Sequence, residues 1–152
     1  MIAEEVGSVL TQIARRWNFR LDNTGQLNTW RMDIAIKQTD GSVVFQYVYI
    51  WLNRDHAGKD RLYMNSPCGP LLDNSPLPDI LREAVWCNYS CIAITRMKRA
   101  DQMQQDEIVV QCVPSLTQAT ETLLEEMIYE TAVNAQVIIQ RFFSSPSDQQ
   151  PG

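Results

Sequence analysis

The chain has 152 residues, of which 45% are hydrophobic and 20% are charged, and its formal net charge is −5. This length and composition are those of one ordinary globular domain that buries a core without disulfides or metals. The negative charge disfavours a general electrostatic grip on nucleic acid or on an anionic membrane, so neither is predicted as a partner.

The N-terminus predicts a cytoplasmic protein. Glu4 and Glu5 stand where a secretory signal carries basic residues, and no apolar stretch follows them. No window in the chain reaches the roughly 18 apolar residues of a membrane span. In the reducing cytoplasm the cysteines should remain free thiols.

The first half of the chain predicts one helix followed by three strands. Apolar residues recur at helical spacing over residues 2–17, and alternation of apolar and polar residues predicts a strand over 30–37. Thr39-Asp40-Gly41 is typical of a hairpin turn. The next strand, 43–52, is apolar on both faces, so it is expected at the centre of a sheet and covered on both sides. A short third strand is expected over residues 61–65.

The second half predicts a helix, two strands and a long final helix. The segment from Pro67 to Pro78 is too rich in proline for a regular element, and a helix should follow it and end near Asn88. Ser115 and Gln118 match a capping box that would open the last helix. The expected strands are 89–97 and 107–113, the final helix is 116–143, and the tail 144–152 is expected to be disordered.

Together these elements predict an α+β fold. The order α-β-β-β-α-β-β-α fits a single domain over residues 1–143, with an antiparallel sheet flanked by helices.

No residue pattern predicts a metal site. The chain has four cysteines, Cys68, Cys87, Cys91 and Cys112, and none of them forms a C-x-x-C pair. They are therefore expected to be inert thiols, with Cys68, between a proline and a glycine, the most exposed of them.

Nothing in the sequence predicts catalysis or a cofactor. The one histidine, His56, lies in a turn, where a solvated side chain is the usual state. No glycine-rich loop follows a strand and opens a helix, so no phosphate site is predicted. The protein is expected not to be an enzyme, and the alternative is a small enzyme that assembles its site from Asp33, His56 and Cys68.

The candidate binding residues are aromatic. Phe45, Tyr47, Tyr49 and Trp51, called here the aromatic row, alternate along one strand, and Trp30 lies on the strand before it. They could pack beneath the helices, or they could offer an open face to a partner, since tyrosine and tryptophan give large contact area at low entropic cost. The segment 67–78 could form one wall of such a groove or be a plain connection.

The element order resembles a known family. Together with runs such as Trp30-Arg31-Met32-Asp33-Ile34-Ala35-Ile36 and Ser42-Val43-Val44-Phe45-Gln46-Tyr47-Val48-Tyr49-Ile50, it resembles the type III secretion chaperone-like fold, and most of all its YbjN-like branch, over residues 2–143. The resemblance implies a chaperone or adaptor that binds a segment of a client protein, and that can be a homodimer. One cyanobacterial assembly chaperone for carboxysome shell proteins resembles the same branch, which makes shell assembly one possible role.

Two hypotheses therefore compete with the enzyme. The first is a non-enzymatic chaperone or adaptor that binds a client segment on a sheet face or at a sheet edge. The second is a structural or regulatory subunit whose final helix is buried in a homodimer.

Overall fold

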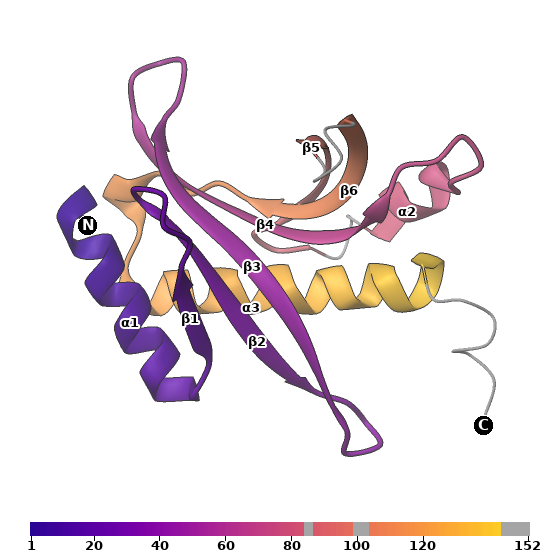
Figure 1. Ribbon diagram of the computed structural model, residues 1–152, viewed down its shortest axis with the longest axis horizontal. Coiled ribbons are helices and arrows are strands. Elements are labelled where there is room, and N and C mark those ends of the chain that lie inside the picture. Colours follow the sequence, from indigo (N-terminus) through magenta and orange to yellow (C-terminus); the bar gives the residue numbers. More distant parts are fainter. Residues whose placement is uncertain (84–86, 99–103, 144–152) are drawn as a thin grey trace.

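Six strands form one antiparallel sheet in the spatial order β1-β2-β3-β4-β6-β5, and helices α1 and α3 pack against one of its faces (Figure 1). This computed structural model describes residues 1–83, 87–98 and 104–143. The predicted α+β class is confirmed. The strands are β1 Arg20–Asn23, β2 Thr29–Lys37, β3 Val43–Arg54, β4 Asp60–Pro70, β5 Cys91–Lys98 and β6 Gln104–Cys112, and the helices are α1 Val6–Trp17, α2 Leu77–Glu83 and α3 Glu121–Ile138.

Helix α1 ends in a sharp reversal that starts the sheet. Asn18 adopts the left-handed conformation, with φ 56°, and the Phe19 amide donates to the Ala14 carbonyl at 2.8 Å. This is a common way to stop a helix, and asparagine tolerates it better than most residues. The chain then forms β1, a four-residue strand that the sequence did not predict.

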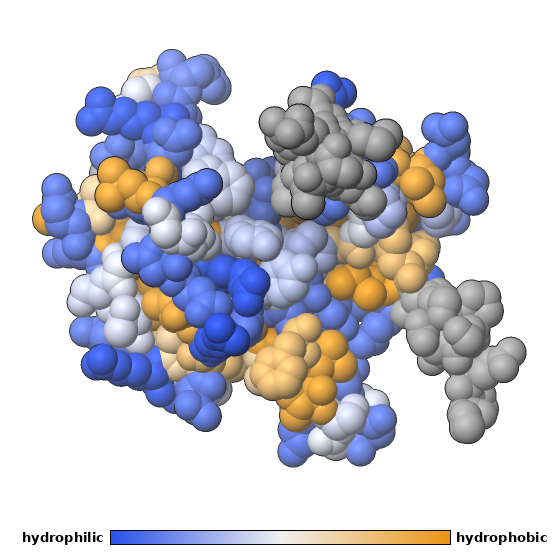
Figure 2. Space-filling model, in the orientation of Figure 1, coloured by the Kyte–Doolittle hydropathy of each residue, from blue (hydrophilic) through white to orange (hydrophobic). Residues whose placement is uncertain are grey.

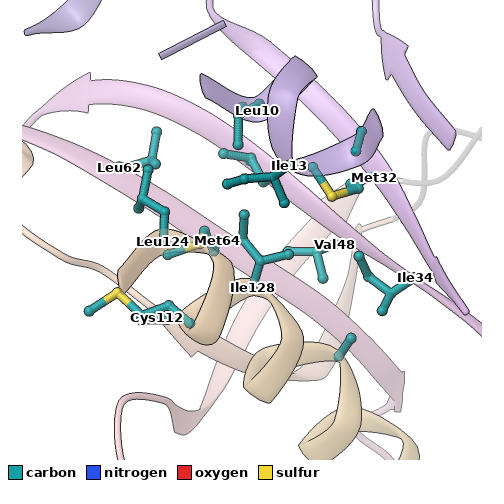
Figure 3. Close-up of a cluster of buried hydrophobic side chains, with 14 of the residues drawn as sticks. Leu10, Ile13, Met32, Ile34, Val48, Leu62, Met64, Cys112, Leu124 and Ile128 are labelled. Carbon is teal, nitrogen blue, oxygen red and sulfur yellow. The ribbon is translucent and has the colours of Figure 1, made fainter. Parts of the chain in front are cut away.

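The main core lies between the sheet and the two long helices (Figure 3). Alternate residues of β2, β3 and β4 point toward the helices, because successive side chains of a strand point to opposite faces. Burial of each large apolar side chain stabilises the fold by about 1.5–3 kcal/mol. The fully buried members include Leu10 and Ile13 of α1, Met32 and Ile34 of β2, Val48 and Ile50 of β3, Leu62 and Met64 of β4, and Leu124 of α3.

The final helix starts later than predicted. Ser115 precedes a 3-10 turn, Leu116–Gln118, and its hydroxyl lies 2.9 Å from the Thr117 hydroxyl instead of capping a backbone amide. Thr120 is the N-cap of α3, and its side chain accepts from the Leu123 amide at 3.1 Å. The helix continues as a π-helical turn, Ile139–Phe143, up to the last residue that the structure describes.

Strand β4 is longer than predicted because it continues into the proline-rich segment as far as Pro70. The expectation that this segment holds no regular element is therefore wrong for residues 67–70. A bulge between Pro67 and Gly69 interrupts its pairing with β6, and such irregularities are where sheets accept proline. At the bulge, Cys68 packs in a second cluster with Ile80 of α2 and Ile138 of α3. The predicted end of the α2 helix near Asn88 and the predicted disorder of 144–152 concern segments that include residues outside the described ranges.

Candidate functional site

The aromatic row of β3 lies on the face of the sheet opposite α1 and α3. Val48 and Ile50 are fully buried toward the helices, so the row points the other way. Strand β3 is central in the sheet, as predicted, but Phe45 is 69% exposed and Tyr47 is 40% exposed. The expectation that this strand is covered on both sides is therefore wrong.

Within the described ranges no helix packs on this face, which is called here the helix-free face. Neighbouring rings partly cover it. Trp51 stacks on Tyr63 of β4, with ring centroids 5.4 Å apart, and Tyr47 meets Tyr49 edge to face at 5.5 Å. Such pairs contribute about 0.5–1.5 kcal/mol each beyond the area they bury. Phe45 lies at the end of the row, near the exposed Val43, and Figure 2 shows an apolar patch over this end of the β2–β3 hairpin.

Arg31 of β2 contacts an aromatic ring and two carboxylates on the same face. Its guanidinium lies 5.3 Å from the centre of the Tyr47 ring and pairs with Asp33 at 3.3 Å and Asp22 at 3.4 Å. The charge of Asp33 is the main cause of the raised pKa of Arg31. This arginine is therefore fully charged, and two carboxylates hold it in place.

Trp30 is separated from the aromatic row. It is paired with Ile50 and points to the helix side of the sheet, where its ring packs against the core and against Gly7 of α1. A methyl group added at Gly7 would lie 3.5 Å from this ring. The structure thus brings four of the five predicted binding residues together on one face and places the fifth on the other.

A second feature lies at the edge of the sheet next to α1. Strand β1 pairs only with the first part of β2, and its last partner along β2 is Asp33. No strand in the described part of the chain pairs with residues 34–37 on that side, although β3 pairs with them on the other. Figure 1 shows the β2–β3 hairpin extending past the short β1 and beyond both helices.

The direction of the free backbone groups follows from the hydrogen bonds at the two ends of β2. The Gln38 amide donates to the Ser42 carbonyl at 2.8 Å, and the Leu52 amide donates to the Asn28 carbonyl at 3.0 Å. Along an antiparallel strand, alternate residues direct their backbone groups to alternate sides. The backbone N–H and C=O groups of even-numbered β2 residues therefore point to β3. Those of the odd-numbered residues Ala35 and Lys37 point to the free edge.

A groove of about 1030 Å³ opens beside this edge, between the C-terminal end of α1 and one flank of α3. Ala35 and Lys37 are the two β2 residues that line it, as expected if their backbone groups face it. The rest of the lining is largely apolar and aromatic: Ile13, Trp17, Phe19, Tyr89, Ile128, Tyr129 and Val133, with Asn88, Thr122, Glu125, Glu126 and Glu130.

Comparison of the chain with family models, curated proteins and solved structures found no match. The site must therefore be interpreted from its own geometry.

Three carboxylates of α3 line the groove, and they differ in their partners. Glu125 pairs with Arg16 at 2.6 Å and accepts from the Trp17 indole. Glu130 accepts from the Ser90 hydroxyl and from three backbone amides, of Asn88, Tyr89 and Ser90. Burial raises the pKa of Glu130, but these hydrogen bonds outweigh burial and leave it below its usual value.

Glu126 is the third of these carboxylates. It accepts from the Tyr89 hydroxyl at 3.1 Å, and this hydrogen bond is the main cause of the raised pKa of Tyr89. Its partner is thus a neutral phenol, whereas Glu125 is paired with a cation.

The three residues of the enzyme alternative are not brought together. Asp33 lies on the helix-free face, and His56 is exposed in the β3–β4 turn. Cys68 is 7% exposed in the second cluster, where burial raises its thiol pKa to about 12. The prediction that Cys68 is the most exposed cysteine is wrong, because strand β4 continues past Pro67 and Cys91 is the exposed one. Within the described ranges, no three histidine, cysteine, aspartate or glutamate side chains are placed so that they could hold a metal ion.

Sequence reasoning missed both the free edge and the groove. The only local signal for the edge is the brevity of the apolar–polar pattern after Phe19, which suits a strand too short to cover β2. The groove depends on how α1 and α3 are placed on the sheet. No helix in the described part of the chain is long and apolar enough to cross a membrane.

Proposed function

We propose that the protein is a non-enzymatic binding module, a chaperone or adaptor, that takes up an extended segment of a client protein at the free edge of β2. Two features coincide at this edge and carry the proposal: backbone groups of Ala35 and Lys37 that no strand of the described residues pairs, and an apolar groove that the same two residues line. An added strand pairs such backbone groups and buries alternate side chains.

We propose that such a segment lies antiparallel to β2, as a continuation of β1. It would exchange hydrogen bonds with Ala35 and Lys37. Its side chains opposite Ile34 and Ile36 would point to the helix side, into the groove. The side chain opposite Ala35 would lie on the helix-free face near Phe45, the cross-strand partner of Ala35.

The exposed end of the aromatic row would therefore belong to the same binding surface. Phe45 adjoins the edge, whereas Trp51 lies at the far end of the row against Tyr63. The role of Tyr47, Tyr49 and Trp51 in partner binding stays a prediction. Phe45→Ala should weaken binding at the edge. Trp51→Ala should weaken binding only if the partner lies along the whole face, so the two variants distinguish the two modes.

Peptide selection tests the proposal without a known client. A phage-displayed library of random linear dodecapeptides is selected on the immobilised full chain, and enriched peptides are synthesised for affinity measurements. Methylation of one peptide amide at a time should then weaken binding at alternate positions only, because a strand paired along one edge uses every second N–H.

The matched variants are Ala35→Pro and Ala35→Ser. Proline removes the outward N–H donor at a position where an edge strand tolerates it, and serine keeps that donor. We expect Ala35→Pro to abolish peptide binding and Ala35→Ser to preserve it, with circular dichroism confirming that both variants fold. Equal affinities for the two variants, or a methylation scan without alternation, would contradict strand addition.

A further inference from the structure

We propose that the segment bound at the β2 edge carries a lysine or arginine beside its apolar side chains, and that Glu126 of α3 is the carboxylate that meets this cation. This inference deepens the proposed function and rests on it. It names the chemistry of the partner: an extended segment that is apolar at alternate positions and basic at an adjoining one.

The apolar part of this specification comes from the walls of the groove. Trp17 at the end of α1 and Tyr129 on α3 are 56% and 45% exposed, which is unusual for side chains so rich in apolar area. Both line the groove, together with Val133. Side chains opposite Ile34 and Ile36 would enter between these walls, so a segment with two aliphatic or aromatic residues, two positions apart, buries this surface.

The basic part comes from the charges of the groove. Its lining includes three carboxylates, Glu125, Glu126 and Glu130, and a single lysine, Lys37, among the described residues. Strand alternation turns the Lys37 side chain toward the helix-free face, because its neighbour Ile36 is buried on the helix side. The carboxylates therefore dominate the charge that a groove-facing side chain meets.

Glu126 is the carboxylate best placed to accept a cation from outside. Arg16 already pairs with Glu125, and the hydrogen bonds of Glu130 hold the Asn88–Ser90 backbone. Among the described residues, the Tyr89 hydroxyl is the one side chain that donates to Glu126, and it is neutral. The Glu126 side chain is exposed. A lysine or arginine of the segment would add a charge-assisted hydrogen bond there.

The experiment compares peptides selected on the full chain with peptides selected on Glu126→Gln. We expect lysine and arginine to be enriched beside the apolar positions with the natural chain, and this enrichment to be lost with the variant. For a basic peptide, Glu126→Gln should lower affinity about two- to fivefold, the range of a partly exposed ion pair, and added salt should lessen the difference. Asp73→Asn, at an exposed position outside the groove, is the matched control and should change nothing.

A charge exchange makes the test specific. Glu126→Lys should reject the basic peptide and prefer its Lys→Glu counterpart, which a merely structural role of Glu126 would not produce. Edge-bound peptides without a basic preference would overturn this inference and leave the proposed function standing. Failure to select any edge-bound peptide would overturn both, as would a concentration-dependent dimer whose own β2 edges occupy the groove.

Discussion

At the scale of single residues, Asp55 shows how one carboxylate closes a hairpin. One of its oxygens accepts from the Ala57 and Lys59 amides at 2.9 and 3.0 Å, and the other accepts from the Arg61 guanidinium at 2.6 Å. The hydrogen bond from Arg61 is the main reason that the pKa of Asp55 falls from 3.8 to about 2. A pKa lower in the folded than in the unfolded state means that ionised Asp55 stabilises the fold.

Replacement of Asp55 by asparagine should therefore lower the thermal midpoint near neutral pH. The loss should shrink as pH falls from about 4 toward 2, because the aspartate of the unfolded chain takes up a proton in this range and the stability that ionised Asp55 gives the fold is progressively lost. Thermal melts of both proteins at neutral and acidic pH measure this. Asp73→Asn is the control, and a gap between Asp55→Asn and the natural chain that stays constant with pH would contradict the assignment.

At the scale of elements, a buried amide network holds α3 against the sheet. The Gln136 side chain of α3 donates to the Gln46 side-chain oxygen at 2.7 Å. Gln46 of β3 in turn donates to the Ser66 hydroxyl and the Pro67 carbonyl of β4, at 2.8 and 2.9 Å. These hydrogen bonds satisfy polar groups that are otherwise costly to bury. They can form only when α3 is rotated about its axis so that Gln136 points to the sheet.

Gln136→Leu should lower the free energy of unfolding by about 1–3 kcal/mol, because the Gln46 oxygen is left buried without its donor. Gln12→Leu, the same exchange at an exposed position of α1, should stay within about 0.5 kcal/mol of the natural chain. Urea unfolding followed by far-ultraviolet circular dichroism measures both. Equal unfolding midpoints for the two variants would show that the network does not fix the helix.

At the scale of the whole molecule, the packing of helices on one face of the sheet determines which cysteine thiols are exposed to solvent. Cys68 and Cys112 lie between the sheet and the helices, 7% and 3% exposed, and burial raises the pKa of each to about 12. Cys91 is exposed. The two buried thiols therefore remain protonated and unreactive while the fold persists, since the thiolate is the reactive form.

A thiol reagent such as 5,5′-dithiobis(2-nitrobenzoate) should modify Cys91 in the native protein and spare Cys68 and Cys112. All four cysteines should react once the chain is unfolded in guanidinium chloride. Mass spectrometry of tryptic peptides assigns each modified site. Rapid native labelling of Cys68 or Cys112 would mean that the helix layer opens far more readily than its packing implies.

Periodicity predicted the interior well, because the helix of residues 2–17 and the strand of 30–37 each bury one continuous stripe. It failed for β3, where two apolar faces suggested cover on both sides. Val48 and Ile50 are indeed under helices, but Tyr47, Tyr49 and Trp51 are only partly covered, by one another and by Tyr63 and Arg31. A strand pattern records that a side chain is apolar and says nothing about what covers it.

The candidate site was less predictable, because it depends on long-range placement. The aromatic row was recognised from its alternation, and Phe45 emerged as its exposed member only with the sheet assembled. The free edge exists because β1 begins opposite Asp33, and the groove exists because α1 and α3 flank that edge. Neither relation is local in sequence, and the four residues of β1 are too few to form a clear pattern.

The left-handed residue at the end of α1 has a consequence for how such a site can be retuned. Asn18 stops the helix and sends the chain back along β2, so the position of this stop determines how far β1 can reach. A stop one turn earlier in α1 would leave more chain to lie along β2 and would seal residues 34–37 with the protein's own backbone. The length of β2 that is open to another strand is therefore set at the C-terminal end of α1, and insertions or deletions there would lengthen or close the free edge.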